Sequence, residues 1–340
     1  MSERATPLAV VGTGSWGTAL AIHLGRQGLA VRLWGRDPVL VREIGDRREN
    51  ARYLPGVSMP PSVDLIPDQE EALAAAEIVI AAVPSHVVEH TLDSMKSAIR
   101  PDAVLVSASK GLEPARAERV SVVLGRLFPG RPLAVLSGPS FAGEVARGRP
   151  TALVIASADD AVARMLQQTL GSSAFRLYTN RDVVGVELAG ALKNVMAIAT
   201  GLADGLDLGE NARAAVITRG LAEIVRLGVA LGAQPTTFLG LAGIGDLVLT
   251  CTGSLSRNRS LGREIARGRR LAEIEAETRM IAEGVRTVTS ALRLANEAGI
   301  AMPICEEVRC VLFEGKSVEE ALSSLLARGP RPEDDRAIAS

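Results

Sequence analysis

Lys193 is the residue of this chain best placed to act as an acid or a base. It lies in the segment VGVELAGALKNVMAIATGL, in which small residues recur every four positions and so share one face of a predicted helix. A lysine set among apolar neighbours is partly desolvated, which lowers its pKa toward neutrality and suits it to proton transfer. The alternative is a structural lysine whose ammonium group extends from the helix edge into water. The small residues that share its face are Gly185, Ala189, Ala197 and Gly201.

A glycine-rich segment farther along the chain offers groups that could bind a phosphate. It reads GLAGIGDLVLTCTGSLSRNRSLG, and its glycines indicate a constrained loop. Asp246 follows these glycines and could orient a lysine. Hydrogen-bond donors come from Ser256, Arg257 and Asn258, and the guanidinium of Arg257 could bind a phosphate through two parallel hydrogen bonds. Taken alone, such a loop is also typical of a solvated surface.

The N-terminal segment carries a dinucleotide-binding pattern. Gly12, Gly14 and Gly17 form G-x-G-x-x-G after the apolar run 8–11 and at the start of a predicted helix over residues 18–25. In this context the glycines permit a tight turn, a close approach of a pyrophosphate and close packing of the helix on the strand. The helix N-terminus also presents N–H groups to the anion. The pattern therefore predicts a site for NAD or NADP.

The residue at the end of the second predicted strand bears on the choice between these two cofactors. Arg36 lies about 20 residues after the glycine motif, where an acidic residue would bind a free ribose 2′-hydroxyl. A guanidinium can instead bind the 2′-phosphate or stack on adenine, which favours NADP. In the alternative, Arg36 is only solvated and the neighbouring Asp37 binds the ribose.

Further candidates follow other predicted strands, because ligands of open parallel sheets lie beyond the carboxyl ends of the strands. Lys110 follows the fourth predicted strand, and Gly138 and Ser140 follow the fifth. At neighbouring strand ends they would place one cation and several donors against a small anionic or carbonyl substrate. The alternative for Lys110 is a plain surface charge.

These residues require a framework that the sequence also predicts. Short apolar runs alternate with helical or loop segments through the first half, the pattern of βα units wound around a parallel sheet. We therefore predict a Rossmann-type parallel-sheet domain that binds NAD(P) over residues 1–185. The predicted strands are residues 8–11, 30–34, 77–83, 103–107, 133–136 and 152–156.

The second half of the chain changes in character after about residue 178. Strand-like runs disappear, and long segments with helical periodicity occupy residues 186–202, 212–231 and 285–298. We predict an all-helical substrate and catalytic domain over residues 186–328. The remaining residues, 329–340, contain prolines and charges with little to pack, which predicts a flexible tail.

The composition limits the partners and the location of the protein. The 340 residues are 47% apolar and 23% charged with a net charge of −1, so a folded chain without a global field for nucleic acid or an anionic bilayer is expected. No unbroken apolar run approaches the roughly 18 residues that span a membrane, and no signal-peptide pattern is present. We expect a cytoplasmic protein with a small-molecule substrate.

Metal ligands and disulfides are not predicted. Cys251, Cys305 and Cys310 are few, odd in number and without metal-ligand spacing, so they read as small core residues in a reducing compartment. His86 and His90 have the spacing of a helical metal pair, but no third ligand of clear type lies nearby.

Taken together, the motifs resemble those of the bacterial NAD(P)-dependent glycerol-3-phosphate dehydrogenases. They occur in that family's order and extend from residue 12 to about residue 287. Two departures, Ala282 for a more usual valine and Ser254 for a frequently acidic residue, remove no group that the reaction needs. The stretches are GTGSWGTALA, ASKGLE, SGPSFAGEVA, ELAGALKNVMAIATG, GIGDLVLTCTGSLSRN and AEGVRT.

The resemblance implies roles for individual residues. Lys193 corresponds to the family's proton-transferring lysine, assisted by Lys110 and Asp246. The residues implied in cofactor binding, besides the three glycines, are Ser15, Trp16, Arg36, Lys110, Ala142, Arg257, Ile281 and Glu283. Those implied in substrate binding are Lys110, Gly138, Ser140, Lys193, Asp246, Ser256, Arg257 and Asn258.

The same resemblance implies an activity. It is the reversible reduction of dihydroxyacetone phosphate by NAD(P)H to sn-glycerol 3-phosphate, which feeds phospholipid synthesis. The apolar helices of the second half are compatible with a homodimer, which the family also suggests. Two alternatives remain. A β-hydroxyacid or 6-phosphogluconate-type dehydrogenase also joins a Rossmann domain to a helical domain with a lysine, and a non-catalytic redox sensor would bind NAD(P) without turnover.

Overall fold

The computed structural model describes residues 7–277 and 282–329, which fall into two compact units. The first unit comprises Met1–Ser109 and Val120–Val183, and the second comprises Lys110–Arg119 and Val184–Ser340. Ile281 and the predicted tail from residue 330 onward lie outside the described residues.

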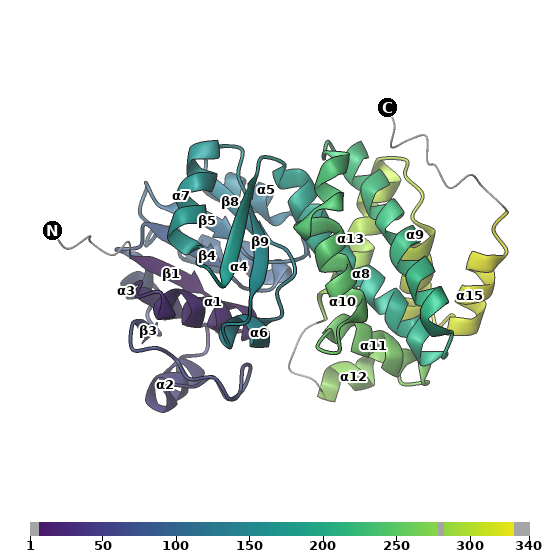
Figure 1. Ribbon diagram of the computed structural model, residues 1–340, viewed down its shortest axis with the longest axis horizontal. Coiled ribbons are helices and arrows are strands. Elements are labelled where there is room, and N and C mark those ends of the chain that lie inside the picture. The colour runs from purple at the N-terminus through teal and green to yellow at the C-terminus, as the bar shows by residue number, and fades with distance from the viewer. Residues whose placement is uncertain (1–6, 278–281, 330–340) are drawn as a thin grey trace. The chain divides into compact units, whose positions relative to one another are not determined.

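A mostly parallel eight-stranded sheet forms the centre of the first unit (Figure 1). The strand order is β10-β9-β8-β5-β4-β1-β2-β3. All neighbouring strands are parallel except β8 and β9, which run antiparallel. The Rossmann-type fold class predicted for this half is confirmed. The strands are β1 (Leu8–Val11), β2 (Val31–Trp34), β3 (Val63–Ile66), β4 (Ile78–Ala81), β5 (Val104–Ser107), β8 (Leu133–Ser137), β9 (Thr151–Ala156) and β10 (Phe175–Asn180).

Helices cover both faces of this sheet, and each face has its own apolar core. Successive side chains of a strand point to opposite faces, so Leu8 and Val10 of β1 enter one core while Ala9 and Val11 enter the other. Burial on both faces is why the central strands β1 and β4 read as unbroken apolar runs in the sequence. The helices are α1 (Ser15–Arg26), α2 (Pro38–Arg47), α3 (Gln69–Leu73), α4 (Val88–Ser94), α5 (Val120–Leu127), α6 (Ala142–Ala146) and α7 (Asp160–Leu170), with a 3₁₀ turn at Ser85–Val87.

Two strands of the eight-stranded sheet were not predicted, and both lie at its edges. Edge strand β3 reads VDLI and is buried only at its first residue. Edge strand β10 reads FRLYTN, in which buried Phe175 and Leu177 alternate with exposed residues. Neither segment is a continuous apolar run, because a strand with one partner buries fewer of its side chains.

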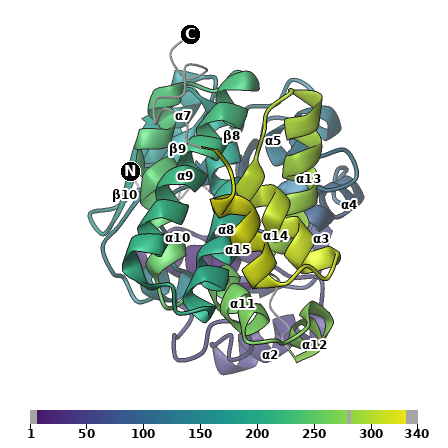
Figure 2. The same cartoon turned by 90° about the vertical axis from the view of Figure 1, so that its right-hand side faces the viewer.

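The second unit is helical, as predicted, and α8 is its central element (Figure 2). By length and composition α8 could cross a membrane, but 89% of its most apolar 18-residue window is buried inside the protein, as in a core helix. The helices are α8 (Val183–Gly205), α9 (Gly209–Ala230), α10 (Asp246–Thr252), α11 (Arg257–Ala266), α12 (Leu271–Glu277), α13 (Glu283–Glu297), α14 (Pro303–Phe313) and α15 (Val318–Leu326). A 3₁₀ turn at Pro235–Leu239 and a π turn at Leu241–Gly245 precede α10.

The segment Lys110–Arg119 packs with the helical unit, although the sequence analysis placed it in the first domain. It forms a small antiparallel hairpin of β6 (Leu112–Glu113) and β7 (Glu118–Arg119). Arg119 forms an ion pair with Glu187 of α8 at 3.1 Å, and Arg293 of α13 donates to the Ala115 carbonyl at 2.9 Å. These long-range contacts hold the segment on the helices, and no local sequence pattern predicts them.

Candidate active site

The glycine motif forms a tight turn between β1 and α1. Gly12 has φ of +125°, and a Cβ there would lie 2.6 Å from the Ala82 carbonyl oxygen, so only glycine fits. A Cβ at Gly17 would lie 2.0 Å from the Gly12 oxygen, whereas a Cβ at Gly14 would meet no atom within 4 Å. Two glycines are thus needed for packing, and the space beside Gly14 is open, as the close approach of a pyrophosphate requires.

Helix α1 begins at Ser15, directly after this turn. Gly14 is its N-cap residue and has no side chain with which to cap the helix, and the first turn carries no acidic residue. Backbone N–H groups and the positive end of the helix dipole therefore favour an anion here. Ser15 and Trp16, both implied in cofactor binding, are the first two residues of α1. The residues of this turn thus fit a dinucleotide pyrophosphate.

A buried asparagine that the sequence analysis missed fixes the same turn. Asn50 is fully buried, and its Nδ2 donates to the Thr13 carbonyl and to Thr18 Oγ1, both at 2.8 Å. Thr18 Oγ1 in turn donates to the Thr13 carbonyl at 3.3 Å. Asn50 lies far from the motif in sequence and within no recognisable pattern, so only the fold shows this function.

Arg36 and Asp37 differ in their availability to a ribose. Asp37 is the N-cap of α2: its Oδ1 accepts from Val39 N at 3.0 Å, and its Oδ2 lies 3.6 Å from the Arg52 guanidinium. Arg36 is exposed at the end of β2 and forms no ion pair with a described residue. The carboxylate that could have bound the ribose is therefore already engaged, whereas the guanidinium is not.

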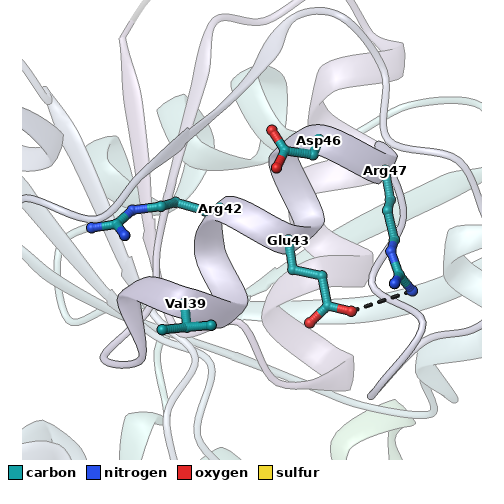
Figure 3. Close-up of a pocket in the computed structure, with 5 residues that line it drawn as sticks. All are labelled: Val39, Arg42, Glu43, Asp46 and Arg47. Atoms are coloured by element: carbon teal, nitrogen blue, oxygen red, sulfur yellow. Dashed lines mark ion pairs between the residues drawn. The ribbon is translucent and has the colours of Figure 1, made fainter.

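A hollow on the surface of α2 has the features of a solvated surface and not of a cofactor site (Figure 3). It is lined by side chains of this one helix, and Glu43 and Arg47 within it form an ion pair at 3.2 Å. Exposed charges of both signs on a single helix make a solvated surface. The lining residues are Val39, Arg42, Glu43, Asp46 and Arg47.

In the second unit, Lys193 and Lys110 share the carboxylate of Asp246. Lys193 Nζ donates to Oδ1, and Lys110 Nζ donates to Oδ2 at 2.9 Å. Lys193 is 5% exposed and Asp246 is completely buried. Burial lowers the pKa of Lys193 to about 7, Asp246 opposes this shift, and the second cation, Lys110, adds to it. A lysine of this kind can give and take a proton near neutral pH.

The local sequence explains how these side chains come to be buried. Lys193 stands in α8, which is apolar all around and therefore surrounded by other helices. Asp246 is the first residue of α10 and directly follows the π turn Leu241–Gly245, where a carboxylate also interacts favourably with the helix dipole. The glycine-rich loop predicted from the sequence is this π turn.

A chain of amide hydrogen bonds connects the other residues of this cluster. Gly284 N donates to Asn258 Oδ1 at 3.0 Å, and Asn258 Nδ2 donates to Asn194 Oδ1 at 2.9 Å. Asn194 Nδ2 then donates to the Lys110 carbonyl at 3.1 Å. The chain links the start of α13, next to Glu283, with α11, α8 and the hairpin segment. Asn194 thereby orients the main chain of Lys110.

The predicted phosphate-binding residues lie at the start of α11. Ser256 is the N-cap, and its hydroxyl accepts from Arg259 N at 3.3 Å, so that this side chain stabilises the helix start. Arg257 is exposed at the first helical position; desolvation lowers the pKa of its guanidinium, and the carboxylate of Glu283 partly offsets this shift. Its guanidinium and the N–H groups of the helix N-terminus together suit a phosphate.

The remaining predicted residues lie in the first unit. Gly138, with φ of +127°, follows β8, and Ser140 Oγ donates to the Gly138 carbonyl at 2.9 Å. Ala142 begins α6. Lys110 follows β5, as expected, but it belongs to the helical unit through its contacts with Asp246 and Asn194. Among the described residues, no three His, Cys, Asp or Glu side chains gather as metal ligands would.

Comparison with known proteins shows what the chain resembles. Residues 7–163 match the N-terminal domain of NAD-dependent glycerol-3-phosphate dehydrogenase, and residues 182–323 match its C-terminal domain. A glycerol-3-phosphate dehydrogenase (NAD(P)+) of Citrifermentans bemidjiense is 49% identical over 332 residues, 97% of this chain and 99% of that protein. One of Streptomyces griseus is 47% identical over 327 residues, 96% of this chain and 97% of that protein.

A solved structure agrees with these matches. The glycerol-3-phosphate dehydrogenase of Coxiella burnetii superposes with a TM-score of 0.92 at 39% identity, covering 95% of this chain and 99% of that one. A D-mandelate dehydrogenase reaches a TM-score of 0.63 at 14% identity, which shows a shared fold alone. The glycine turn, the two lysines that share Asp246 and these matches together place the chain in the NAD-dependent glycerol-3-phosphate dehydrogenase family.

Proposed function

We propose that this protein catalyses the reversible reduction of dihydroxyacetone phosphate to sn-glycerol 3-phosphate with NAD(P)H. The observation that carries the proposal is the buried Lys193, hydrogen-bonded to Asp246 and with a pKa of about 7. A ketone reduction is accelerated by a group that stabilises the negative charge developing on oxygen and that then gives up a proton. Lys193 has both properties.

The chain's residues divide the work of this reaction. NAD(P)H, held by the Gly12–Gly17 turn and Arg36, supplies the hydride when bound. The Lys193 ammonium stabilises the developing alkoxide and delivers its proton to the C2 oxygen. In the reverse direction, neutral Lys193 takes the proton from the C2 hydroxyl. Asp246 holds Lys193 in place, and the positive charge of Lys110 on the same carboxylate helps to lower the pKa of Lys193.

The substrate's phosphate is proposed to bind at the start of α11. Arg257 is exposed there, and Asn258 and Ser256 support the helix start through their own hydrogen bonds. Holding the nonreacting phosphate orients the ketone and lets binding energy contribute to catalysis. Gly138 and Ser140 remain candidates for substrate contact, and Ala142, Glu283 and Ile281 for cofactor contact; Ile281 lies outside the described residues.

An assay of the purified full-length chain tests this proposal. NADPH and NADH absorbance should each be followed with dihydroxyacetone phosphate, and the reverse reaction with sn-glycerol 3-phosphate. Consumption of cofactor that depends on dihydroxyacetone phosphate is expected. Turnover of a small β-hydroxyacid or 6-phosphogluconate instead would establish the rival dehydrogenase. Cofactor binding without turnover of any of these substrates would establish the redox-sensor reading.

Further properties belong to the proposal. Exposed Arg36 and the engaged Asp37 favour NADP over NAD. We also propose a cytoplasmic location and a role in phospholipid synthesis, and we expect neither nucleic-acid binding nor membrane insertion. The central helix α8 is buried in its own unit, which supports the second expectation. A homodimer is proposed by analogy with the family, and light scattering of the purified chain would test it.

A further inference from the structure

Helix α11 crosses α8 with the two backbones in direct contact. A Cβ on Gly201 of α8 would lie 2.1 Å from the Arg259 carbonyl oxygen. A Cβ on Gly262 of α11 would lie 2.2 Å from the Ile198 carbonyl oxygen. Glycine on both sides is therefore required for the crossing. Since α8 carries Lys193 and α11 begins at Arg257, the crossing fixes one of these residues relative to the other.

A buried carboxylate reinforces the same crossing. Asp204, near the end of α8, has a side chain only 7% exposed. Its Oδ2 accepts from Arg259 Nε at 2.6 Å, and its Oδ1 accepts from Arg213 Nε at 2.8 Å and from Arg213 NH2 at 2.5 Å. Charge-assisted hydrogen bonds of this geometry are strong and directional.

Arg259 also connects the crossing to α10. Its NH1 donates to the Thr252 carbonyl, the last residue of α10, at 2.7 Å. This arginine therefore ties together the end of α8, the end of α10 and the first turn of α11. The loop between α10 and α11, which leads to Arg257, is held at both of its ends by one guanidinium.

Two arginines of the motif SRNR thus differ in what they do. Residues two apart on a helix project in different directions, and Arg257 is exposed whereas the Arg259 side chain is only 13% exposed. Arg259 donates from Nε to Asp204 and from NH1 to the Thr252 carbonyl, so these two bonds fix the direction of its guanidinium. Arg257 is the one available to a phosphate.

We propose that Asp204 and Arg259 are positioning residues that set the place of the substrate's phosphate relative to Lys193. The inference rests on the proposed function, because it concerns the phosphate subsite of that reaction. With Arg259 correctly held, the first turn of α11 presents Arg257 and its N–H groups at a fixed distance from the acid–base lysine. Without the Arg259 side chain, the loop between α10 and α11 and the adjoining Arg257 lose the hydrogen bonds that position them. The hydrogen bond between Lys193 and Asp246 does not depend on Arg259.

Arg213 makes this inference testable. When Arg259 is replaced, Asp204 keeps both of its hydrogen bonds from Arg213, so the negative charge of the buried carboxylate still has a cationic partner. The fold should therefore survive the loss of the Arg259 side chain. Arg259→Lys, which retains a cation for Asp204 but cannot also reach the Thr252 carbonyl in the same geometry, provides the milder variant.

The test compares dihydroxyacetone phosphate with unphosphorylated dihydroxyacetone in Arg259→Met. We expect kcat/KM for dihydroxyacetone phosphate to fall about 10- to 100-fold, mainly through a higher KM, since misplacing a positioning group costs that much. For dihydroxyacetone, which has no phosphate to place, kcat/KM should stay within about twofold of the wild type. The Kd of NADPH should not change. Arg259→Lys and Asp204→Asn should show smaller losses of the same selectivity.

Arg267→Met is the matched control, because Arg267 follows α11 at its far end and is exposed. It should leave both substrates unaffected. Equal losses for the two substrates in Arg259→Met, or no loss for either, would overturn the inference. If Arg259→Met fails to fold, the same comparison in Arg259→Lys decides it. Absence of wild-type turnover with dihydroxyacetone phosphate would instead refute the proposed function itself.

Discussion

Lys193 donates a hydrogen bond to Oδ1 of Asp246, and both residues are buried. The other oxygen of the carboxylate accepts from Lys110, so one anion serves two cations. Two full positive charges against a single negative charge in a site of low dielectric leave an excess that favours release of one proton. Lys193 is the more deeply buried of the two lysines, and its pKa is lowered to about 7.

The rates of the two reaction directions should depend on pH in opposite ways. Reduction of dihydroxyacetone phosphate needs protonated Lys193, so its kcat/KM should fall as pH rises through about 7. Oxidation of glycerol 3-phosphate needs neutral Lys193, so its kcat/KM should fall as pH decreases through the same value. Initial rates measured in both directions between about pH 5 and pH 9 check this.

Asp246→Asn supplies an internal check of the same pH profile. Asp246 raises the pKa of Lys193, so its neutralisation should move the midpoint to lower pH in whatever activity remains. A midpoint that stays in place, or profiles of the same sign in both directions, would contradict Lys193 as the titrating group.

Replacement of the lysine itself should separate chemistry from cofactor binding. Lys193→Met should lower kcat by about 10²- to 10⁴-fold, because the acid–base group is lost, with the Kd of NADPH unchanged. Fluorescence titration of NADPH and steady-state kinetics measure the two effects. Lys96→Met, at an exposed position, is the control and should behave as the wild type. Near-normal turnover of Lys193→Met would exclude the proposed proton transfer.

Local patterns in the sequence account for the parts of this structure that depend on local geometry. The glycine turn, the strands buried on both faces and helix α8 were all predictable, because each leaves a characteristic period or spacing. Edge strands β3 and β10 were not, because they are only half buried. The antiparallel pairing of β8 and β9 was also missed, since a strand's direction leaves no trace in its own residues.

The partners of the candidate residues were less predictable than the residues themselves. Asp246 was expected to orient a lysine. It binds both Lys110 and Lys193, however, because segments that are distant in the sequence meet in the folded chain. Asn50 and Asp204 carry no motif at all, and their importance follows only from which groups surround them. The functional roles assigned to individual residues remain predictions for the experiments described.

The preference for NADP should depend on Arg36. Arg36→Asp replaces a group that can bind a 2′-phosphate by one that repels it and accepts from a 2′-hydroxyl. The ratio of kcat/KM with NADPH to that with NADH should fall about 10- to 100-fold, as expected for loss of a charge-assisted hydrogen bond. Arg42→Asp, an exposed change on α2, is the control (Figure 3). An unchanged ratio in Arg36→Asp would remove Arg36 from the ribose site.

Glu223 should make the stability of the helical unit depend on pH. This carboxylate is 2% exposed and accepts from Ile304 N at 2.8 Å and Cys305 N at 3.4 Å, at the start of α14. Burial raises its pKa from 4.5 to about 7, so its contribution to stability is fully present below about pH 4.5 and is lost as pH rises through about 7.

Urea unfolding of Glu223→Gln beside the wild type isolates this effect. The wild type should lose stability relative to Glu223→Gln between about pH 5 and pH 8, by at most about 3 kcal/mol. The amide of Glu223→Gln cannot ionise. The contributions of all other titrating groups therefore cancel when the free energy of unfolding of the variant is subtracted from that of the wild type. A constant difference across this range would mean that Glu223 keeps its charge state throughout.

Asn50→Asp tests whether the glycine turn must be held rigidly for the cofactor to bind. The substitution preserves shape but replaces the Nδ2 donor by an oxygen, which would face the Thr13 carbonyl at the place of a hydrogen bond now 2.8 Å long. An unmade buried hydrogen bond costs about 1–3 kcal/mol, so the Kd of NADPH should rise about 10-fold or more, with the KM of dihydroxyacetone phosphate little changed. Asn211→Asp, exposed on α9, should leave both constants unaltered. If the Kd of NADPH in Asn50→Asp equals that of the wild type, the turn is stable without Asn50, and α1 and β1 alone suffice to place the N–H groups that receive the pyrophosphate.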